Sequence, residues 1–166
     1  AQAIRNLLRQ ALAGRSQEKY SWQAAILDGL GEGLSRRKSD IDGLANHESA
    51  LLAAFFDHPS APIRQGAPGI LRSSGIHTDR AYKNAIEKAV AIARDVKLSE
   101  EKRTEAIQFL GIDDPTPYAS FLENFIRPQE AISVQLAALH TLSLIPGREV
   151  SKYTLENWEA LTPQIR

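Results

Sequence analysis

Two pentapeptides near the end of the chain are closely similar: Phe121-Leu122-Glu123-Asn124-Phe125 and Thr154-Leu155-Glu156-Asn157-Trp158. They lie 33 residues apart (155 − 122), and each follows a segment with helix-like spacing of small and large apolar residues. A period of this length is typical of tandem helical units. The stretch from Ser99 to Arg166 therefore predicts two consecutive copies of one pair of helices.

Two further alignments indicate a unit of similar length. Ala106 to Leu110 aligns with Ala138 to Leu142 at a shift of 32 residues (138 − 106). Pro62-Ile63-Arg64 resembles Pro163-Gln164-Ile165-Arg166 at a shift of 101 (163 − 62), or about three units. The final residues have the pattern of another helix beginning, so we expect the 166 residues to be a fragment of a longer chain.

Turn signals divide the sequence into segments whose apolar residues recur at helical spacing, and none shows sustained strand alternation. We expect a single domain over residues 1–166, all-α in class, built as a HEAT- or armadillo-like α-solenoid of antiparallel helix pairs, with about eight or nine helices. The expected helices cover residues 1–13, 21–37, 42–56, 62–71, 80–96, 99–110, 118–125, 128–142 and 150–158. Pro68 lies inside the fourth helix and is expected to kink it.

The apolar stripes also predict which side chains face the core. Trp22 and Trp158 lie on such stripes, so both are expected to be core residues. The residues expected to be buried in the second helix and in the last two are Trp22, Ala25, Ile26, Leu30, Leu34, Ile132, Leu136, Ala138, Leu139, Leu142, Val150, Tyr153, Leu155 and Trp158. The apolar residues of the third and fourth helices are Leu44, Leu51, Leu52, Phe55, Phe56, Ile63, Ala67, Ile70 and Leu71. Ser99 is expected to be the N-cap of the helix over residues 99–110.

Composition is that of an ordinary globular protein and excludes several chemistries. The hydrophobic fraction is 43%, the charged fraction is 24%, and no apolar run approaches the roughly 20 residues of a membrane-spanning helix. There is no Cys, which excludes disulfides, thiolate ligands and covalent haem attachment within this segment. The charge is +4 (14 − 10) over residues 1–98 and −4 (6 − 10) over residues 99–166, so the concentrated basic face typical of nucleic-acid binding is missing.

Gly29-Leu30-Gly31-Glu32-Gly33 is the cluster that comes nearest to a ligand-binding glycine loop. Its spacing matches neither the dinucleotide-binding pattern nor the P-loop, and no strand-like segment precedes it. Each glycine costs a helix about 1 kcal/mol relative to alanine. We therefore interpret the cluster as a place where helices pack closely. Arg36-Arg37-Lys38, at the end of the same helix, is interpreted as a solvated last turn.

The four histidines give no metal-binding pattern. None belongs to a His-Glu-x-x-His motif, and no two lie within one helical turn. We expect them in loops or at the surface, and His140 at an interface or boundary. The four are His47, His58, His77 and His140.

The remaining candidates are also interpreted as structural. Asp113-Asp114 and Asp40-x-Asp42 lack the glycine and terminal glutamate of an EF-hand and are expected to cap loops. Ser73-Ser74-Gly75 lacks the sequence of a nucleophile elbow. No residue is therefore assigned a catalytic, cofactor-binding or metal-binding role.

A proline near a helix start, followed by an aliphatic residue and Arg as in Pro62-Ile63-Arg64, resembles HEAT repeats. A closer resemblance is carried by Leu27 to Leu34, by Asp57-His58-Pro59, and by Tyr153 to Arg166 with Trp158. These segments look like the helical part of large secreted bacterial proteins of the planctomycete and verrucomicrobial type. In those proteins a sorbosone-dehydrogenase-like β-propeller precedes HEAT-like repeats and a c-type cytochrome domain follows. None of that family's haem or propeller-site residues has a counterpart here.

The resemblance implies a non-catalytic spacer or interaction module between a dehydrogenase-like domain and a cytochrome c domain, in a periplasmic or secreted redox protein. The segment itself is expected to hold no cofactor, to bind neighbouring domains or a protein partner, and to bind neither nucleic acid nor membrane. The alternative is a free-standing scaffold that binds a peptide or protein on a concave helical face. A nucleic-acid enzyme of the alkylpurine glycosylase kind is disfavoured by the balanced charge.

Overall fold

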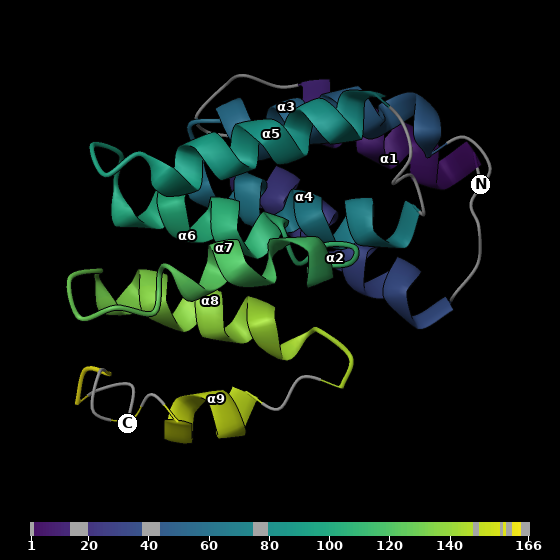
Figure 1. Cartoon of the computed structure of the whole chain (residues 1–166). Helices are drawn as coiled ribbons and strands as arrows, with labels where there is room; N and C mark the ends of the chain where they lie inside the picture. Colours follow the sequence, from purple (N-terminus) through teal and green to yellow (C-terminus); the bar gives the residue numbers. More distant parts are fainter. Residues whose placement is uncertain are drawn as a thin grey trace. The chain divides into compact units, whose positions relative to one another are not determined.

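A computed structural model describes residues 2–13, 20–37, 44–74, 80–147, 150–156, 158 and 161–163. Within these ranges the chain forms nine α-helices and two short 3-10 turns, with no strand, so the predicted all-α class is confirmed (Figure 1). The chain divides into two compact units, Ala1–Ala85 and Ile86–Arg166. The solenoid arrangement remains a prediction.

Unit 1 is built around two helices that pack along each other, α2 and α4. Helix α3 also packs on α4, and α1 packs on α2. The elements of this unit are α1 (Gln2–Ala13), α2 (Tyr20–Arg37), η2 (Ala45–His47), α3 (Glu48–Asp57), α4 (Ala61–Ser74) and the start of α5 (Arg80–Arg94).

Glycines allow α2 and α4 to approach closely. A Cβ atom at Gly31 of α2 would lie 3.3 Å from the Cα of Gly69 in α4. A Cβ at Gly66 of α4 would lie only 2.8 Å from the Cβ of Leu27. The interpretation of the glycine cluster as a close-packing site is thus confirmed for Gly31. At Gly29 and Gly33, by contrast, no described atom lies within 4 Å of such a Cβ.

The predicted core face of α2 is wrong. The buried positions are Gln23, Leu27, Gly31 and Leu34, whereas Trp22 is 39% exposed. Of the residues expected in the core, only Leu34 is buried: Ala25 is exposed, and Ile26 and Leu30 are half-buried. Apolar residues lie on several sides of α2, so its sequence does not define a single buried stripe. The close approach to α4 at Gly31 determines which side is buried.

The predicted faces of α3 and α4 are mostly confirmed. In α3, Leu51, Leu52 and Phe55 are buried and Phe56 is half-buried. The apolar residues predicted for α4 are buried: Ile63, Ala67, Ile70 and Leu71. Helix α4 continues through Pro68. Helix α3 begins at Glu48, after a 3-10 turn, and the expected start at residue 42 lies outside the described residues.

Unit 2 includes the stretch over which the sequence predicts a repeated pair of helices. Helix α8 packs against α6, α7 and α9. The Ser99 side chain accepts a hydrogen bond from the Lys102 backbone N–H at 3.4 Å, which confirms the predicted N-cap of α6. The elements are the end of α5, α6 (Glu100–Phe109), η3 (Thr116–Tyr118), α7 (Ala119–Glu123), α8 (Ile132–Ser143) and α9 (Val150–Glu156).

The predicted faces of α8 and α9 need correction. Helix α8 begins at Ile132 rather than Pro128 and buries Val134, Ala138 and Leu142, of which Ala138 and Leu142 were expected. Ile132 and Leu136 are exposed, and Leu139 is half-buried. In α9, Leu155 is 70% exposed, Val150 and Tyr153 are half-buried, and the following Trp158 is 40% exposed. Apolar residues surround α8, so periodicity alone could not select the face that meets α6.

The even-numbered helices share a feature that the sequence reading missed. The fourth residue of α2, α4, α6 and α8 is polar and buried, and these residues are Gln23, Arg64, Arg103 and Gln135. A positive side chain in the first turn of a helix is disfavoured by the helix dipole. Arg64 and Arg103 must therefore be compensated there by specific acceptors. Figure 1 shows these four helices in the two units.

We expect alanine substitutions to have opposite effects on stability at a glycine that faces open space and at one in the contact between α2 and α4. Gly33→Ala should raise the free energy of unfolding by about 0.5–1 kcal/mol, because the helix gains propensity and the new Cβ meets open space. Gly66→Ala should lower it by about 1–2 kcal/mol, because the new Cβ overlaps Leu27. Urea unfolding monitored by circular dichroism measures both changes. A gain in stability for Gly66→Ala would contradict the packing described for α2 and α4.

Candidate functional site

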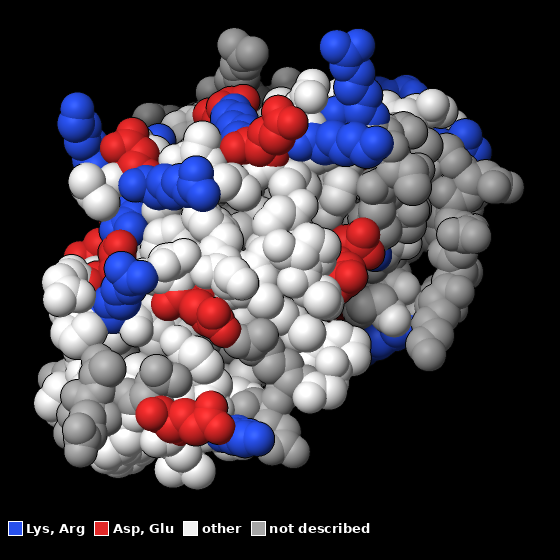
Figure 2. Space-filling view, in the orientation of Figure 1, with Lys and Arg blue, Asp and Glu red and all other residues white. Residues whose placement is uncertain are grey.

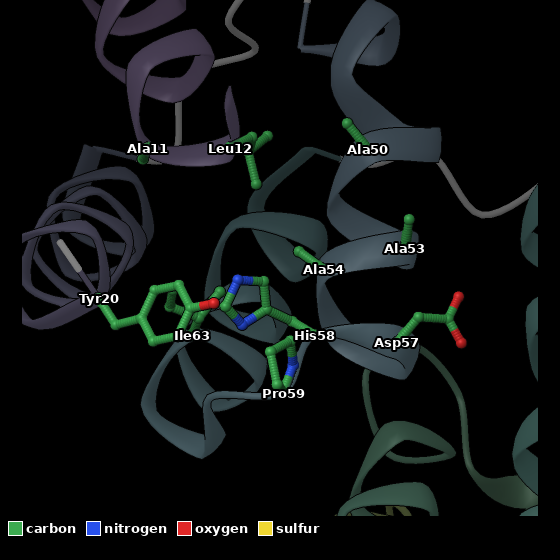
Figure 3. A pocket seen from close by; sticks show the side chains of 10 residues that line it. All are labelled: Ala11, Leu12, Tyr20, Ala50, Ala53, Ala54, Asp57, His58, Pro59 and Ile63. Carbon is green, nitrogen blue, oxygen red and sulfur yellow. The ribbon is translucent and has the colours of Figure 1, made fainter. Parts of the chain in front are cut away.

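A cavity of about 560 Å³ opens in unit 1 between α1, the start of α2, α3 and the α3–α4 loop (Figure 3). Most of its wall is apolar and made of small side chains. Its polar lining residues are Tyr20, Asp57 and His58. The full lining is Ala11, Leu12, Tyr20, Ala50, Ala53, Ala54, Asp57, His58, Pro59 and Ile63.

His58 is held in a defined orientation. Its Nδ1 accepts a hydrogen bond from the Ser60 backbone N–H at 3.1 Å, so in the neutral ring the proton lies on Nε2. The Tyr20 ring packs edge-to-face on the imidazole, with centroids 4.8 Å apart and an interplanar angle of 75°. Figure 3 shows the Asp57 carboxylate pointing away from this pair of rings.

The loop that carries His58 is fixed by Arg64. The Arg64 guanidinium donates hydrogen bonds to the carbonyl oxygens of His58 and Pro59 at 3.0 and 3.1 Å. These carbonyls follow the last turn of α3, where backbone acceptors have no partner within the helix. Burial lowers the pKa of His58, and the positive charge of Arg64 lowers it further. The neutral imidazole is therefore favoured near neutral pH.

The other histidines are not brought together. His47 ends the 3-10 turn before α3, and His140 is exposed in the last turn of α8. His77 lies outside the described residues. Across the described part of the chain, no group of three or more His, Asp or Glu side chains could hold a metal ion.

The remaining sequence candidates act locally. Asp114 Oδ1 accepts the Thr116 backbone N–H at 2.9 Å, which confirms the predicted loop cap. The Thr116 hydrogen bonds hold the pKa of Asp114 below its ordinary value. Ser73 Oγ donates to the Gly69 carbonyl of its own helix at 3.0 Å. Asp40 and Asp42 lie outside the described residues.

The basic run at the end of α2 is solvated where it is described. Arg36 forms an exposed ion pair with Glu32 at 3.2 Å, one helical turn away. Lys38 lies outside the described residues, as does the side chain of Arg37.

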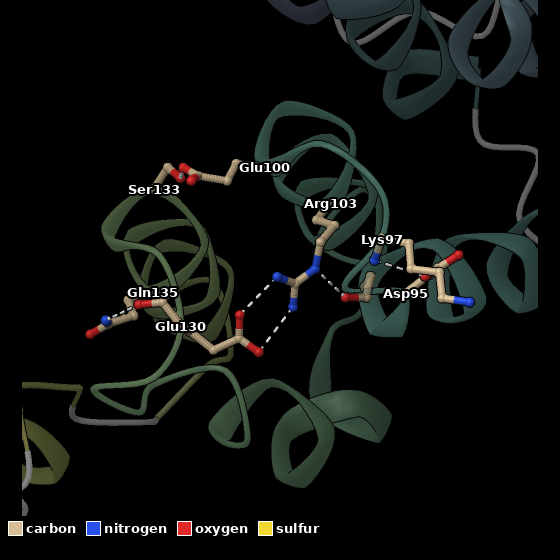
Figure 4. A network of polar contacts seen from close by, with 8 residues as sticks. Asp95, Lys97, Glu100, Arg103, Glu130, Ser133 and Gln135 are labelled. Carbon is tan, nitrogen blue, oxygen red and sulfur yellow. Dashed lines mark hydrogen bonds and ion pairs between the residues drawn. The ribbon is translucent and has the colours of Figure 1, made fainter.

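A polar cluster in unit 2 joins the starts of α6 and α8 to the segments before them (Figure 4). Arg103 donates from Nε to the Ala93 carbonyl at 2.9 Å, and its two terminal nitrogens contact the two Glu130 oxygens at 2.8 and 2.9 Å. Gln135 Nε2 donates to the Glu130 carbonyl at 2.7 Å. Gln135 Oε1 accepts from Thr162 at 3.3 Å. These contacts lie within the unit, so the cluster is structural.

The described surface carries both signs of charge. On the face drawn in Figure 2, Lys and Arg side chains are interspersed with Asp and Glu, and uncharged residues fill the surface between them. Large apolar side chains are exposed mainly around α8 and α9: Ile132, Leu136, Leu144, Leu155 and Trp158. Among the helices that are described, none combines the length and apolar character needed to cross a bilayer.

Comparison of the chain with protein-family models, curated proteins and solved structures finds no match. The resemblance to the helical segment of secreted dehydrogenase-like proteins therefore rests on the sequence motifs.

We expect the Arg103–Glu130 pair to contribute much more to stability than the exposed Arg36–Glu32 pair. Arg103→Met should lower the free energy of unfolding by about 2–4 kcal/mol, because it leaves Glu130 and the Ala93 carbonyl without their donor. Arg36→Met should change it by less than about 0.5 kcal/mol, since that pair is solvated. Chemical unfolding of the two matched variants tests this, and equal losses would contradict it.

Stability should depend on the protonation of His58. The pKa of this group is lowered in the folded chain, so as pH falls below about 6.5 the unfolded chain takes up the proton first. The free energy of unfolding should fall as the pH is lowered through about 6.5, by no more than about 1.4 kcal/mol per pH unit. His58→Asn should reduce this slope, because Asn can still accept the Ser60 N–H but does not titrate. An unchanged slope in the variant would refute the assignment.

Proposed function

We propose that the chain is a non-catalytic helical-repeat module that binds neighbouring domains of its own protein or a protein partner. The main support is the regular placement of the buried polar residues Gln23, Arg64, Arg103 and Gln135. Each is the fourth residue of an even-numbered helix, and these helices pack in the pairs α2–α4 and α6–α8. Units of this kind offer long surfaces for binding without an active site of their own.

Exposed apolar residues around α8 and α9 support a binding role. Ile132 and Leu136 lie one turn apart on the same side of α8, and both are exposed. Leu155 and Trp158 add exposed apolar area at α9 and after it. Tryptophan is over-represented among the residues that dominate binding energy at protein interfaces. This part of unit 2 is therefore the proposed contact region.

We further propose that the module belongs to a redox protein, and sequence resemblance alone supports this part of the proposal. In this setting the module spaces a dehydrogenase-like domain and a cytochrome c domain of a periplasmic or secreted protein, and holds no cofactor itself. The sequence of the full-length gene tests this. A β-propeller upstream and a Cys-x-x-Cys-His motif downstream are expected, and the absence of both would remove the redox setting.

The alternative is a free-standing scaffold for a peptide or protein. The same exposed residues support it, so the two proposals differ in the origin of the partner. A scaffold should retain one stable partner from outside its own gene when used as bait. A spacer should bind only the domains encoded beside it.

We expect substitutions at α9 to weaken binding selectively. The 166-residue chain would be titrated calorimetrically with each separately produced domain of the full-length protein. Leu155→Glu should raise the Kd at least about tenfold, because it places a charge in an apolar contact. Val96→Glu is the matched control, since Val96 is 74% exposed in the loop after α5, and it should leave the Kd unchanged. Equal effects of the two substitutions would place the contact elsewhere.

A further inference from the structure

We infer that the cavity in unit 1 is a binding site for a small apolar molecule that carries one hydrogen-bond acceptor, such as a cyclic or aromatic ketone. This site is separate from the contact region proposed for α8 and α9 and does not depend on it. The cavity volume of about 560 Å³ is within the range of small-molecule sites, about 300–1,000 Å³.

The walls determine the apolar part of the ligand. Four of the lining residues are alanines, and they lie on two helices: Ala11 on α1, and Ala50, Ala53 and Ala54 on α3. Side chains this short leave open the space that a leucine or phenylalanine would occupy. Leu12, Pro59 and Ile63 complete an apolar surface, which favours a ligand with a compact hydrocarbon body.

His58 determines the polar part. Its Nδ1 is used by the Ser60 N–H, which leaves Nε2–H as the hydrogen-bond donor of the neutral ring. In Figure 3 one ring nitrogen is turned toward Pro59 and the other toward the side of the cavity where Leu12 lies. The Tyr20 ring and the Arg64 contacts to the loop hold this arrangement. An oxygen acceptor on the ligand is therefore the complementary group.

The hydrogen-bond donor of His58 distinguishes this site from a purely apolar cavity. Ethylbenzene and acetophenone have similar shapes, but only acetophenone carries a carbonyl acceptor. Ethylbenzene is the more hydrophobic of the two, so a purely apolar cavity would prefer it. A cavity with a positioned donor should prefer acetophenone, and a net hydrogen bond of ordinary strength corresponds to about a fivefold difference in Kd.

The test is an NMR titration of the ¹⁵N-labelled chain with each compound, in which binding is measured from the chemical shifts of the backbone amides. Acetophenone should give saturable shifts centred on residues 50–60 and bind about fivefold more tightly than ethylbenzene. Ala53→Leu should raise the Kd at least tenfold, because it fills the cavity from an exposed wall position. Ala91→Leu, at an exposed position of α5 in unit 2, is the matched control and should leave the Kd unchanged.

His58→Phe isolates the donor, since it keeps a ring against Tyr20 but removes Nε2–H. It should abolish the preference for acetophenone while binding of ethylbenzene persists. Thermal unfolding would show whether this variant folds. If it does not, the proposal is tested by comparing Ala53→Leu with Ala91→Leu, and by comparing the two compounds on the original chain. Absence of saturable shifts, a preference for ethylbenzene in the original chain, or equal effects of Ala53→Leu and Ala91→Leu would each overturn the proposal.

Discussion

A buried polar side chain in the first turn of a helix holds the backbone that leads into that helix, and the connections in both units depend on this contact. Arg64 binds the two carbonyls that follow α3, Arg103 binds a carbonyl in the last turn of α5, and Gln135 binds the carbonyl of Glu130. Carbonyls at and beyond the end of a helix otherwise lack partners within it. A single side chain thus satisfies orphan acceptors and sets the path of the chain between successive helices.

The same contact has different consequences in the two units. In unit 1 Arg64 contacts the loop through backbone carbonyls, and His58 of this loop lines a cavity. In unit 2 the loop before α8 supplies Glu130, whose carboxylate is used by Arg103. This loop is thus held through the Glu130 side chain as well as through the Glu130 carbonyl. The contact region proposed for unit 2 lies instead at the exposed apolar residues around α8 and α9.

Local signals in the sequence predicted the helices well, because caps and breakers act over a few residues. Ser99 and Pro62 lie where a cap and a first-turn proline should, and the stripe of α4 is buried as predicted. The choice of face failed for α2 and α8, since a helix that is apolar on several sides has no single stripe. The cavity could not be predicted, because it depends on alanines from two helices meeting around His58.

The contact between Arg64 and the α3–α4 loop reaches peptide oxygens, which every amino acid carries. These two hydrogen bonds are therefore independent of which side chains the loop carries. A substitution at residue 58 therefore leaves the two acceptors of Arg64 in place, although it removes the hydrogen bond between His58 Nδ1 and the Ser60 N–H. This differs from the close approach of α2 and α4, where the residue type itself is fixed, because a side chain at Gly66 would overlap Leu27.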